Sequence, residues 1–171
     1  MELRTIIRAV KYRYLQLLRI KDTPSRVALG FALGVGAGCL PCMGVQSLIA
    51  LPLAFLIRAN KIASLIGVWW TNPITFVPIY YTEYVIGTLF SSYPLLNYED
   101  FYVKVFQLKN LDDVASLGVD ILAPMTLGSL VLAAILGPIT FFVCRYALEK
   151  RRERRLRKKL KRAQSKRVKL V

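Results

Sequence analysis

Residues 27–57 read VALGFALGVGAGCLPCMGVQSLIALPLAFLI, a run of 31 residues without a charged side chain. Two further uncharged runs cover residues 62–82 and 121–144. A helix that crosses the hydrocarbon core of a bilayer needs about 20 apolar residues, and a soluble domain of this size does not carry several such runs. Together with a composition that is 55% hydrophobic, the runs predict an all-α integral membrane protein.

The first run has an unusual length, because it is too short for two full spans and too long for one. It lies between Arg26 and Arg58, and we expect both on the cytoplasmic side, where Lys and Arg collect. A re-entrant hairpin of two half-helices, broken near Pro41 and Gly44, therefore fits this segment. Pro41 would open the second half-helix, which runs through Gln46. Non-helical backbone at that depth has to be buried in protein or line a wet cavity.

The next run contains a second predicted break, in the stretch WWTNPITFVP at residues 69–78. Asn72 is a strong N-cap residue, and Pro73 fits the first position of a helix because its missing N–H is not needed there. Two helix N-termini, at Pro41 and Pro73, would then point into the membrane interior. Their unpaired N–H groups and the positive ends of their dipoles favour an anion. Paired segments interrupted by Pro or Gly are the best sequence indication of a transporter's binding site.

Charge is concentrated at the two ends of the chain and gives a net value of +15. Basic residues on the flanks of membrane spans set the orientation, so the sequence predicts a multi-pass protein of the bacterial inner membrane with both termini in the cytoplasm. A net acidic loop, at about residues 91–116, suits the outer side. We favour this interpretation over nucleic-acid binding because the basic tail lacks interleaved aromatic residues, and we expect no nucleic-acid partner.

Three regions follow from this topology. Residues 1–22 are expected to form an amphipathic helix, which lies on the anionic leaflet or packs against the protein itself with the same face. Residues 23–146 form the membrane domain, which ends in one C-terminal transmembrane helix. Residues 147–171 form a basic cytoplasmic tail. The last span carries glycines that allow close helix approach within one chain or in a homodimer, namely Gly118, Gly128 and Gly137.

Several motifs within residues 23–87 resemble a bacterial membrane family known as domain of unknown function 2062. The resemblance rests on a T-P pair, a G-x-x-x-G in the first half-helix, P-x-x-G-x-Q at the first break, R-x-N after it, and N-P-x-T-x-x-P-x-Y-Y at the second. In this chain the motif residues are Thr23, Pro24, Gly30, Gly34, Pro41, Gly44, Gln46, Arg58, Asn60, Asn72, Pro73, Thr75, Pro78, Tyr80 and Tyr81. The resemblance implies an integral membrane protein, and it implies no particular activity.

Cys39 and Cys42 have the C-x-P-C spacing of a disulfide oxidoreductase. The family pattern has ordinary apolar residues at these two positions, so the resemblance gives the thiols no shared role. A reactive thiol needs partial exposure or cationic neighbours, and no charged residue lies within a dozen positions on either side. Free cysteine also packs well as a small apolar residue. A membrane thiol redox protein is therefore the least favoured hypothesis.

Features of an enzyme are missing from the sequence. The chain contains no histidine, which is the commonest general base and metal ligand. No cluster of Asp, Glu and Cys has the spacing of a metal site, and no serine lies in a nucleophile elbow. We therefore expect neither an enzymatic activity nor a cofactor.

Glu83 is the one carboxylate within a predicted membrane helix. Ionisable residues inside a membrane are costly to bury and commonly functional, so Glu83 is a candidate proton relay or a partner of Arg58 or Lys61. The alternative is a structural position, either near the interface or paired with Arg26.

The favoured hypothesis is a small protein that transports or binds an anionic lipid, such as a polyisoprenyl phosphate, or another anion at the two broken helices. Basic residues at the cytoplasmic mouth would supply charge, and the helix N-termini would hold the phosphate. Uncharged polar residues beside the breaks would line this site, or they would cap helices and hydrogen-bond across the bundle. The candidate binding residues are Arg26, Pro41, Gly44, Gln46, Arg58, Lys61, Asn72, Pro73, Thr75 and Glu83. The alternative is a non-transporting membrane scaffold that acts through its basic tail.

Overall fold

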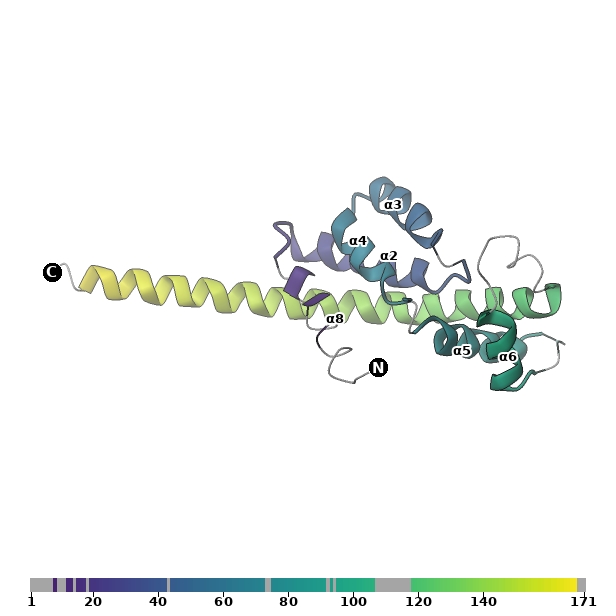
Figure 1. Cartoon of the computed structure of the whole chain (residues 1–171). Coiled ribbons are helices and arrows are strands. Elements are labelled where there is room, and N and C mark those ends of the chain that lie inside the picture. Colours follow the sequence, from purple (N-terminus) through teal and green to yellow (C-terminus); the bar gives the residue numbers. More distant parts are fainter. Residues whose placement is uncertain are drawn as a thin grey trace.

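The computed structural model describes residues 8, 12–13, 15–17, 19–42, 44–72, 75–91, 93, 95–106 and 118–168. These residues form helices and turns and contain no strand, which confirms the all-α fold class. The helices labelled in Figure 1 are α2 (Pro24–Gly38), α3 (Gln46–Leu56), α4 (Lys61–Val68), α5 (Phe76–Thr88), α6 (Tyr98–Phe106) and α8 (Val119–Val168).

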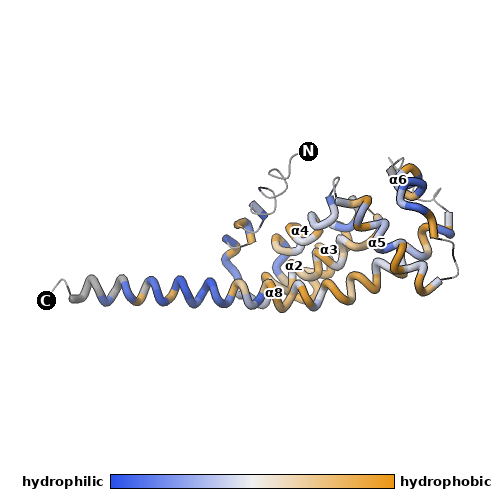
Figure 2. Tube along the Cα trace, turned by 90° about the horizontal axis from the view of Figure 1, so that it is seen from below, coloured by the Kyte–Doolittle hydropathy of each residue, from blue (hydrophilic) through white to orange (hydrophobic). Residues whose placement is uncertain are grey.

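Helix α8 is the longest element, and the other helices lie along its N-terminal half (Figure 1). Its 50 residues extend over about 75 Å at a rise of about 1.5 Å per residue. The first half is apolar and the second half is strongly basic, a change that Figure 2 shows as orange giving way to blue. In the described part of the chain, α8 is the one helix long and apolar enough to cross a membrane. The predicted last span and the predicted tail are thus one continuous helix as far as Val168.

Helices α2 and α5 pack on α8 one after the other and run antiparallel to it (Figure 1). Gly36, near the end of α2, lies against Ala133, and Gly87, near the end of α5, lies against Pro124. The apolar run of α8 covers residues 121–144. The end of α2 and the start of α5 therefore lie beside the middle of this apolar run.

Helices α2 and α4 run parallel and very close to each other. A Cβ at Gly30 would overlap the carbonyl oxygen of Asn60, and a Cβ at Gly34 would overlap the carbonyl oxygen of Ser64. Any side chain at these positions would force the two backbones apart, which is why small residues favour such crossings. The G-x-x-x-G motif therefore serves to pack α2 on α4.

One of the three glycines expected to allow close approach in the last span does so within the chain. A Cβ at Gly128 would overlap the carbonyl oxygen of Glu83 in α5. Gly118 precedes α8 with φ +75°, and a Cβ at Gly137 would meet no atom of the described residues within 4 Å. Only Gly137 of the three therefore remains available to a second chain within α8.

Helix α3 begins at Gln46, so the prediction that Pro41 opens this helix is wrong. The described residues between α2 and α3 form bends and turns, in which the N–H of Val45 bonds to the carbonyl oxygen of Cys42 at 3.1 Å. Gly44 lies in this turn, and Pro41 lies in the bend directly before it. The interruption between α2 and α3 is present, while its re-entry into a membrane stays a prediction.

Helix α5 begins at Phe76, and its N-cap position is held by Thr75, so the prediction that Asn72 is the N-cap is also wrong. The Asn72 carbonyl oxygen instead accepts hydrogen bonds from the N–H groups of Thr75 and Phe76, each at 2.9 Å. The Thr75 hydroxyl donates to the carbonyl oxygen of Trp70 at 2.9 Å. These bonds form a turn ahead of α5, and Pro73 lies outside the described residues.

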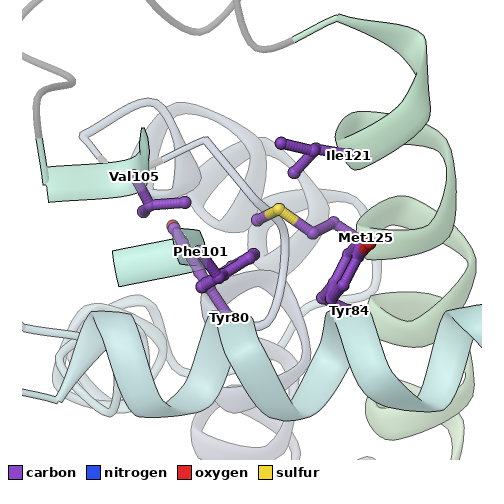
Figure 3. Packing of buried hydrophobic residues seen from close by; sticks show 6 residues of the cluster. All are labelled: Tyr80, Tyr84, Phe101, Val105, Ile121 and Met125. Atoms are coloured by element: carbon purple, nitrogen blue, oxygen red, sulfur yellow. The ribbon is translucent and has the colours of Figure 1, made fainter. Parts of the chain in front are cut away.

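The predicted outer loop at residues 91–116 contains helix α6, which packs on α5. Phe101 and Val105 of α6 are fully buried. Figure 3 shows them in a cluster with Tyr80 and Tyr84 of α5 and with Ile121 and Met125 of α8. Helix α6 is therefore part of the folded core, and residues 107–117 lie outside the described part of the chain.

For the predicted amphipathic helix at residues 1–22, the described positions 12–13 and 15–17 are helical. Leu17 is buried in a cluster with Val27, Ala63 and Ile66. At this position the apolar face of the segment packs against the protein itself.

Candidate functional site

The end of α2 at the first break is closed by side chains from α3, α5 and the α4–α5 turn. Gln46 Nε2 lies 2.8 Å from the carbonyl oxygen of Leu40, 3.1 Å from that of Gly38 and 3.1 Å from the Tyr80 hydroxyl. The Tyr80 hydroxyl donates to the Leu40 carbonyl oxygen at 3.3 Å, and the Thr71 hydroxyl donates to the Gly38 carbonyl oxygen. The last carbonyl groups of a helix need partners of this kind. Gln46, only 2% exposed, therefore holds the break together.

The N-termini of α3 and α5 lie near each other at this break, because Gln46 is the first residue of α3 and Tyr80 lies one turn into α5. The carbonyl end of α2 lies there as well, so an anion would meet acceptor oxygens in addition to N–H groups. Gly44 is exposed with φ +94°, and Pro41 is half-buried. A ligand role for these residues, and for Asn72 and Thr75 in the second turn, stays a prediction.

Arg26, Arg58 and Lys61 come together at the opposite end of α3, one helix length of 11 residues or about 16 Å from the break. The Nε of Arg26 donates to the carbonyl oxygen of Arg58 at 2.8 Å. Lys61 is the first residue of α4, and its Nζ lies 4.3 Å from the centroid of the Phe55 ring. The structure thus separates the predicted basic residues from the predicted helix breaks.

Asp22 and Asn60 fix the basic residues in place. One carboxylate oxygen of Asp22 accepts from the Asn60 side chain at 2.9 Å, and the other lies 3.5 Å from a terminal nitrogen of Arg26. The hydrogen bond from Asn60, with further help from the Thr23 N–H and from Arg26, lowers the pKa of Asp22 despite its partial burial. Asn60 also caps α4 by accepting from the N–H of Ala63 at 2.9 Å.

Arg58 has a left-handed backbone conformation, with φ +55°. Its N–H bonds to the carbonyl oxygen of Phe55 at 3.2 Å, and the N–H of Ala59 bonds to that of Ala54 at 2.8 Å. This is the C-terminal motif in which glycine usually occupies the left-handed position. An L-residue there costs on the order of 1–2 kcal/mol. Arginine thus occupies a position that glycine would fill with less strain, which points to a use for its side chain.

A groove of about 500 Å³ lies between α2, the α3–α4 turn and α8. Its lining consists of Ser25, Arg26, Leu29, Ile57, Arg58 and Phe141. We call it the arginine groove, because two guanidinium groups border an otherwise largely apolar lining. Phe141 lies three residues before the end of the apolar run of α8. The groove is therefore close to the level at which α8 changes from apolar to basic.

A second groove, of about 600 Å³, lies between the N-terminal segment and α4. Arg13, Arg19 and Lys21 contribute charge to it, and the guanidinium carbon of Arg13 lies 4.2 Å from the centroid of the Trp69 ring. These three cations are not among the binding residues that the sequence predicts. Their only signal in the sequence was the concentration of basic residues near the N-terminal end of the chain.

Comparison with known proteins places the chain in a family. A family model described as an uncharacterized protein conserved in bacteria (DUF2062) matches residues 7–157. The chain belongs to the DUF2062 family. The match confirms the resemblance carried by the motifs in residues 23–87 and extends it along α8. No curated protein and no solved structure matches the chain, so an activity of this DUF2062 protein has to be argued from its own residues.

Glu83 lies in the contact between α5 and α8 and is 0% exposed. Neither of its carboxyl oxygens has a hydrogen-bond partner among the residues that the structure describes. The ion pairs between described residues join Arg26 to Asp22 and Arg145 to Glu149. The predicted pairing of Glu83 with Arg26, Arg58 or Lys61 is therefore wrong for this DUF2062 protein, whereas a position near the membrane interface stays a prediction.

The three cysteines are free thiols. Cys39 is fully buried and Cys42 is half-buried at the first break, and they form no disulfide. Among the described residues, no group of three or more His, Cys, Asp or Glu could hold a metal ion.

Proposed function

We propose that this DUF2062 protein is an integral membrane protein that binds an anionic lipid in the arginine groove. The observation that carries the proposal is the arrangement of Arg26 and Arg58, from two different segments, beside Leu29, Ile57 and Phe141. Guanidinium groups are well suited to phosphate, because their fixed N–H groups match its oxygens. The apolar lining suits the first part of a lipid chain. A polyisoprenyl phosphate and a phospholipid share this chemistry.

Exposed apolar surface supports the membrane part of the proposal. Only 11% of the most apolar stretch of α8 is buried, whereas the core helix of a soluble protein would be largely covered. Large apolar side chains are exposed on its outer surface, including Leu130, Ile139 and Phe142. An exposed apolar surface of this extent indicates contact with a membrane or with another protein. A lipid bilayer would cover the apolar part of α8 over its whole length.

The helix directions support a two-sided topology. Helices α4 and α5 run in the same direction, broken by the turn between them, and α8 runs back. The chain would cross outward through α4 and α5 and return through α8, with α2 and α3 as a re-entrant hairpin. Both termini would then lie in the cytoplasm of a bacterial cell, and the arginine groove would face the inner leaflet, where basic residues meet anionic lipids.

We further propose that the protein transports this anionic lipid. The proposal is supported by the two helix breaks, before α3 and before α5, which lie beside the middle of the apolar run of α8. Interrupted helices at this depth are typical of the binding regions of transporters. A lipid phosphate held at Arg26 and Arg58 would begin such a path at the inner leaflet.

Native mass spectrometry of the gently extracted protein tests the lipid proposal. The informative variant is Arg58→Gly, which removes the guanidinium while relieving the backbone strain at φ +55°. We expect a co-purifying phosphate-bearing lipid on the wild-type protein and a loss of about tenfold in its abundance in Arg58→Gly. Arg154→Ala is the matched control, because this arginine lies in the basic half of α8 away from the groove. Equal amounts of the same lipids on all three proteins would contradict the proposal.

A scaffold function is the second candidate, and it rests on the shape of α8. The helix continues for 24 residues beyond Cys144, about 36 Å at the usual rise. This distance is several times the Debye length of about 8–10 Å at physiological salt. The charges at the C-terminal end of α8 would therefore not act on membrane head groups. Deletion of residues 151–171 would abolish a scaffold function and would leave lipid binding in the arginine groove intact.

A further inference from the structure

The contact between α5 and α8 contains a buried carboxyl group that has no hydrogen-bond partner in the described part of the chain. Glu83 is fully buried there, and both carboxyl oxygens lack a hydrogen-bond partner. The backbones touch on both sides of it, because a Cβ at Gly128 would overlap the Glu83 carbonyl oxygen and a Cβ at Gly87 would overlap the Pro124 carbonyl oxygen. No space for a bulky partner is left at this crossing.

The groups that surround Glu83 are neutral. Cys39, at the end of α2, and Tyr80, one turn earlier in α5, lie close enough to interact with it electrostatically. Thiols and phenols ordinarily remain protonated at neutral pH. The Tyr80 hydroxyl is already engaged with Gln46 and with the Leu40 carbonyl oxygen. Helix α8 contributes no charged residue between positions 121 and 144.

We propose that Glu83 is a proton-binding site, separate from the arginine groove. An unpaired carboxylate in such a place costs several kcal/mol, and a bound proton removes this cost without any further partner. A metal cation would need several oxygen ligands around it, and the described residues offer no group of three or more His, Cys, Asp or Glu. The proton is therefore the cation that fits the site.

Release of this proton would require a change in the structure. The carboxylate left behind needs water or a cation, and the close contacts at Gly87 and Gly128 admit neither. The α5–α8 crossing must therefore loosen when Glu83 ionises. Tyr80 connects this crossing to the break after α2 through its bonds to Gln46 and Leu40. A change in the protonation of Glu83 would therefore also change the packing of Tyr80 at the break between α2 and α3.

Labelling of the full-length protein in detergent with dicyclohexylcarbodiimide tests the proposal. The O–H of a protonated carboxyl group adds across one C=N bond of this apolar reagent. In the O-acylisourea that forms, the acyl group moves from oxygen to nitrogen, which gives a stable N-acylurea that retains the whole reagent. We expect peptide mass spectrometry to find the label on Glu83, whereas the exposed Glu99 and Asp100 in α6 remain unmodified. The labelling rate should fall at least about tenfold between roughly pH 6 and roughly pH 11, because only the protonated acid reacts.

Two variants serve as controls. Glu83→Gln should lose the label, and Glu99→Gln should keep it. Arg58→Gly should also keep it, so that failure of the lipid proposal and failure of the proton proposal remain distinguishable. The proposal is overturned if wild-type Glu83 stays unmodified, or if its rate of modification does not change with pH. Both decisive measurements use the wild-type protein, so they do not depend on the folding of a variant.

Discussion

The side-chain nitrogen of Gln46 lies 3.1 Å from the hydroxyl oxygen of Tyr80, which joins the first residue of α3 to α5 across 34 positions of sequence. The same nitrogen reaches the carbonyl oxygens of Gly38 and Leu40. One buried amide therefore ties together the end of α2, the start of α3 and the start of α5. The helix break is a hydrogen-bonded junction, and its stability depends on this side chain.

Replacement of Gln46 by Ala should destabilise the protein by about 1–3 kcal/mol, because it removes a buried amide whose hydrogen bonds join the end of α2 to α3 and α5. The midpoint of thermal unfolding in detergent measures this change. Gln164→Ala, at an exposed position in the basic half of α8, is the matched control and should leave the midpoint unchanged. An equal midpoint for Gln46→Ala and the control would show that the junction does not need the amide.

Replacement of Gly34 by Ala should also destabilise the protein, because the added methyl group would overlap the Ser64 carbonyl oxygen. The expected cost is about 1–3 kcal/mol, the usual range for an overpacked site. Gly137→Ala gives a contrast on α8, since nothing lies within 4 Å of the new Cβ. That variant should be neutral, or up to about 1 kcal/mol more stable because alanine favours the helix. The reverse order of the two unfolding midpoints would refute the α2–α4 packing.

The stability contributed by Asp22 should depend on pH. Its pKa is lowered in the folded protein, first by the hydrogen bond from Asn60. The contribution is therefore fully present above the ordinary aspartate pKa of about 3.9 and is lost as the pH falls through the lowered folded value. In unfolding measurements, Asp22→Asn should be less stable than wild type at neutral pH, and the difference should shrink as the pH falls through the lowered folded pKa of Asp22. A gap that persists unchanged at low pH would contradict the assignment.

Much of the architecture follows from local sequence. The uncharged runs predicted helices, and the Pro- and Gly-containing stretches predicted two interruptions, which the structure contains. Gly30 and Gly34 were recognised from sequence only as a family motif, and their close crossing with α4 is a finding of the structure. The grouping of Arg58 with Lys61 also followed from their short separation along the chain.

The remaining features depend on contacts between distant segments. Pro41 and Asn72 have the local properties of helix starts, yet tertiary hydrogen bonds to Gln46, and the turn held by Thr75, move both starts further along the chain. Helix α6 was missed because it is short, although the spacing of Phe101 and Val105 was its signal. Phe141 could not be assigned to a groove with Arg26 and Arg58 from sequence, since α8 brings it there from more than eighty residues away.

Photochemical crosslinking most directly tests whether an anionic lipid occupies the arginine groove. Protein in vesicles of phosphatidylethanolamine and phosphatidylglycerol would be irradiated with a phosphatidylglycerol analogue that carries a diazirine near its head group. We predict crosslinks in the peptides that contain Leu29, Ile57 or Phe141, reduced about tenfold in an Arg26→Ala, Arg58→Gly double variant. Crosslinks confined to residues 150–168, or an equal yield at the groove in the double variant, would contradict the account.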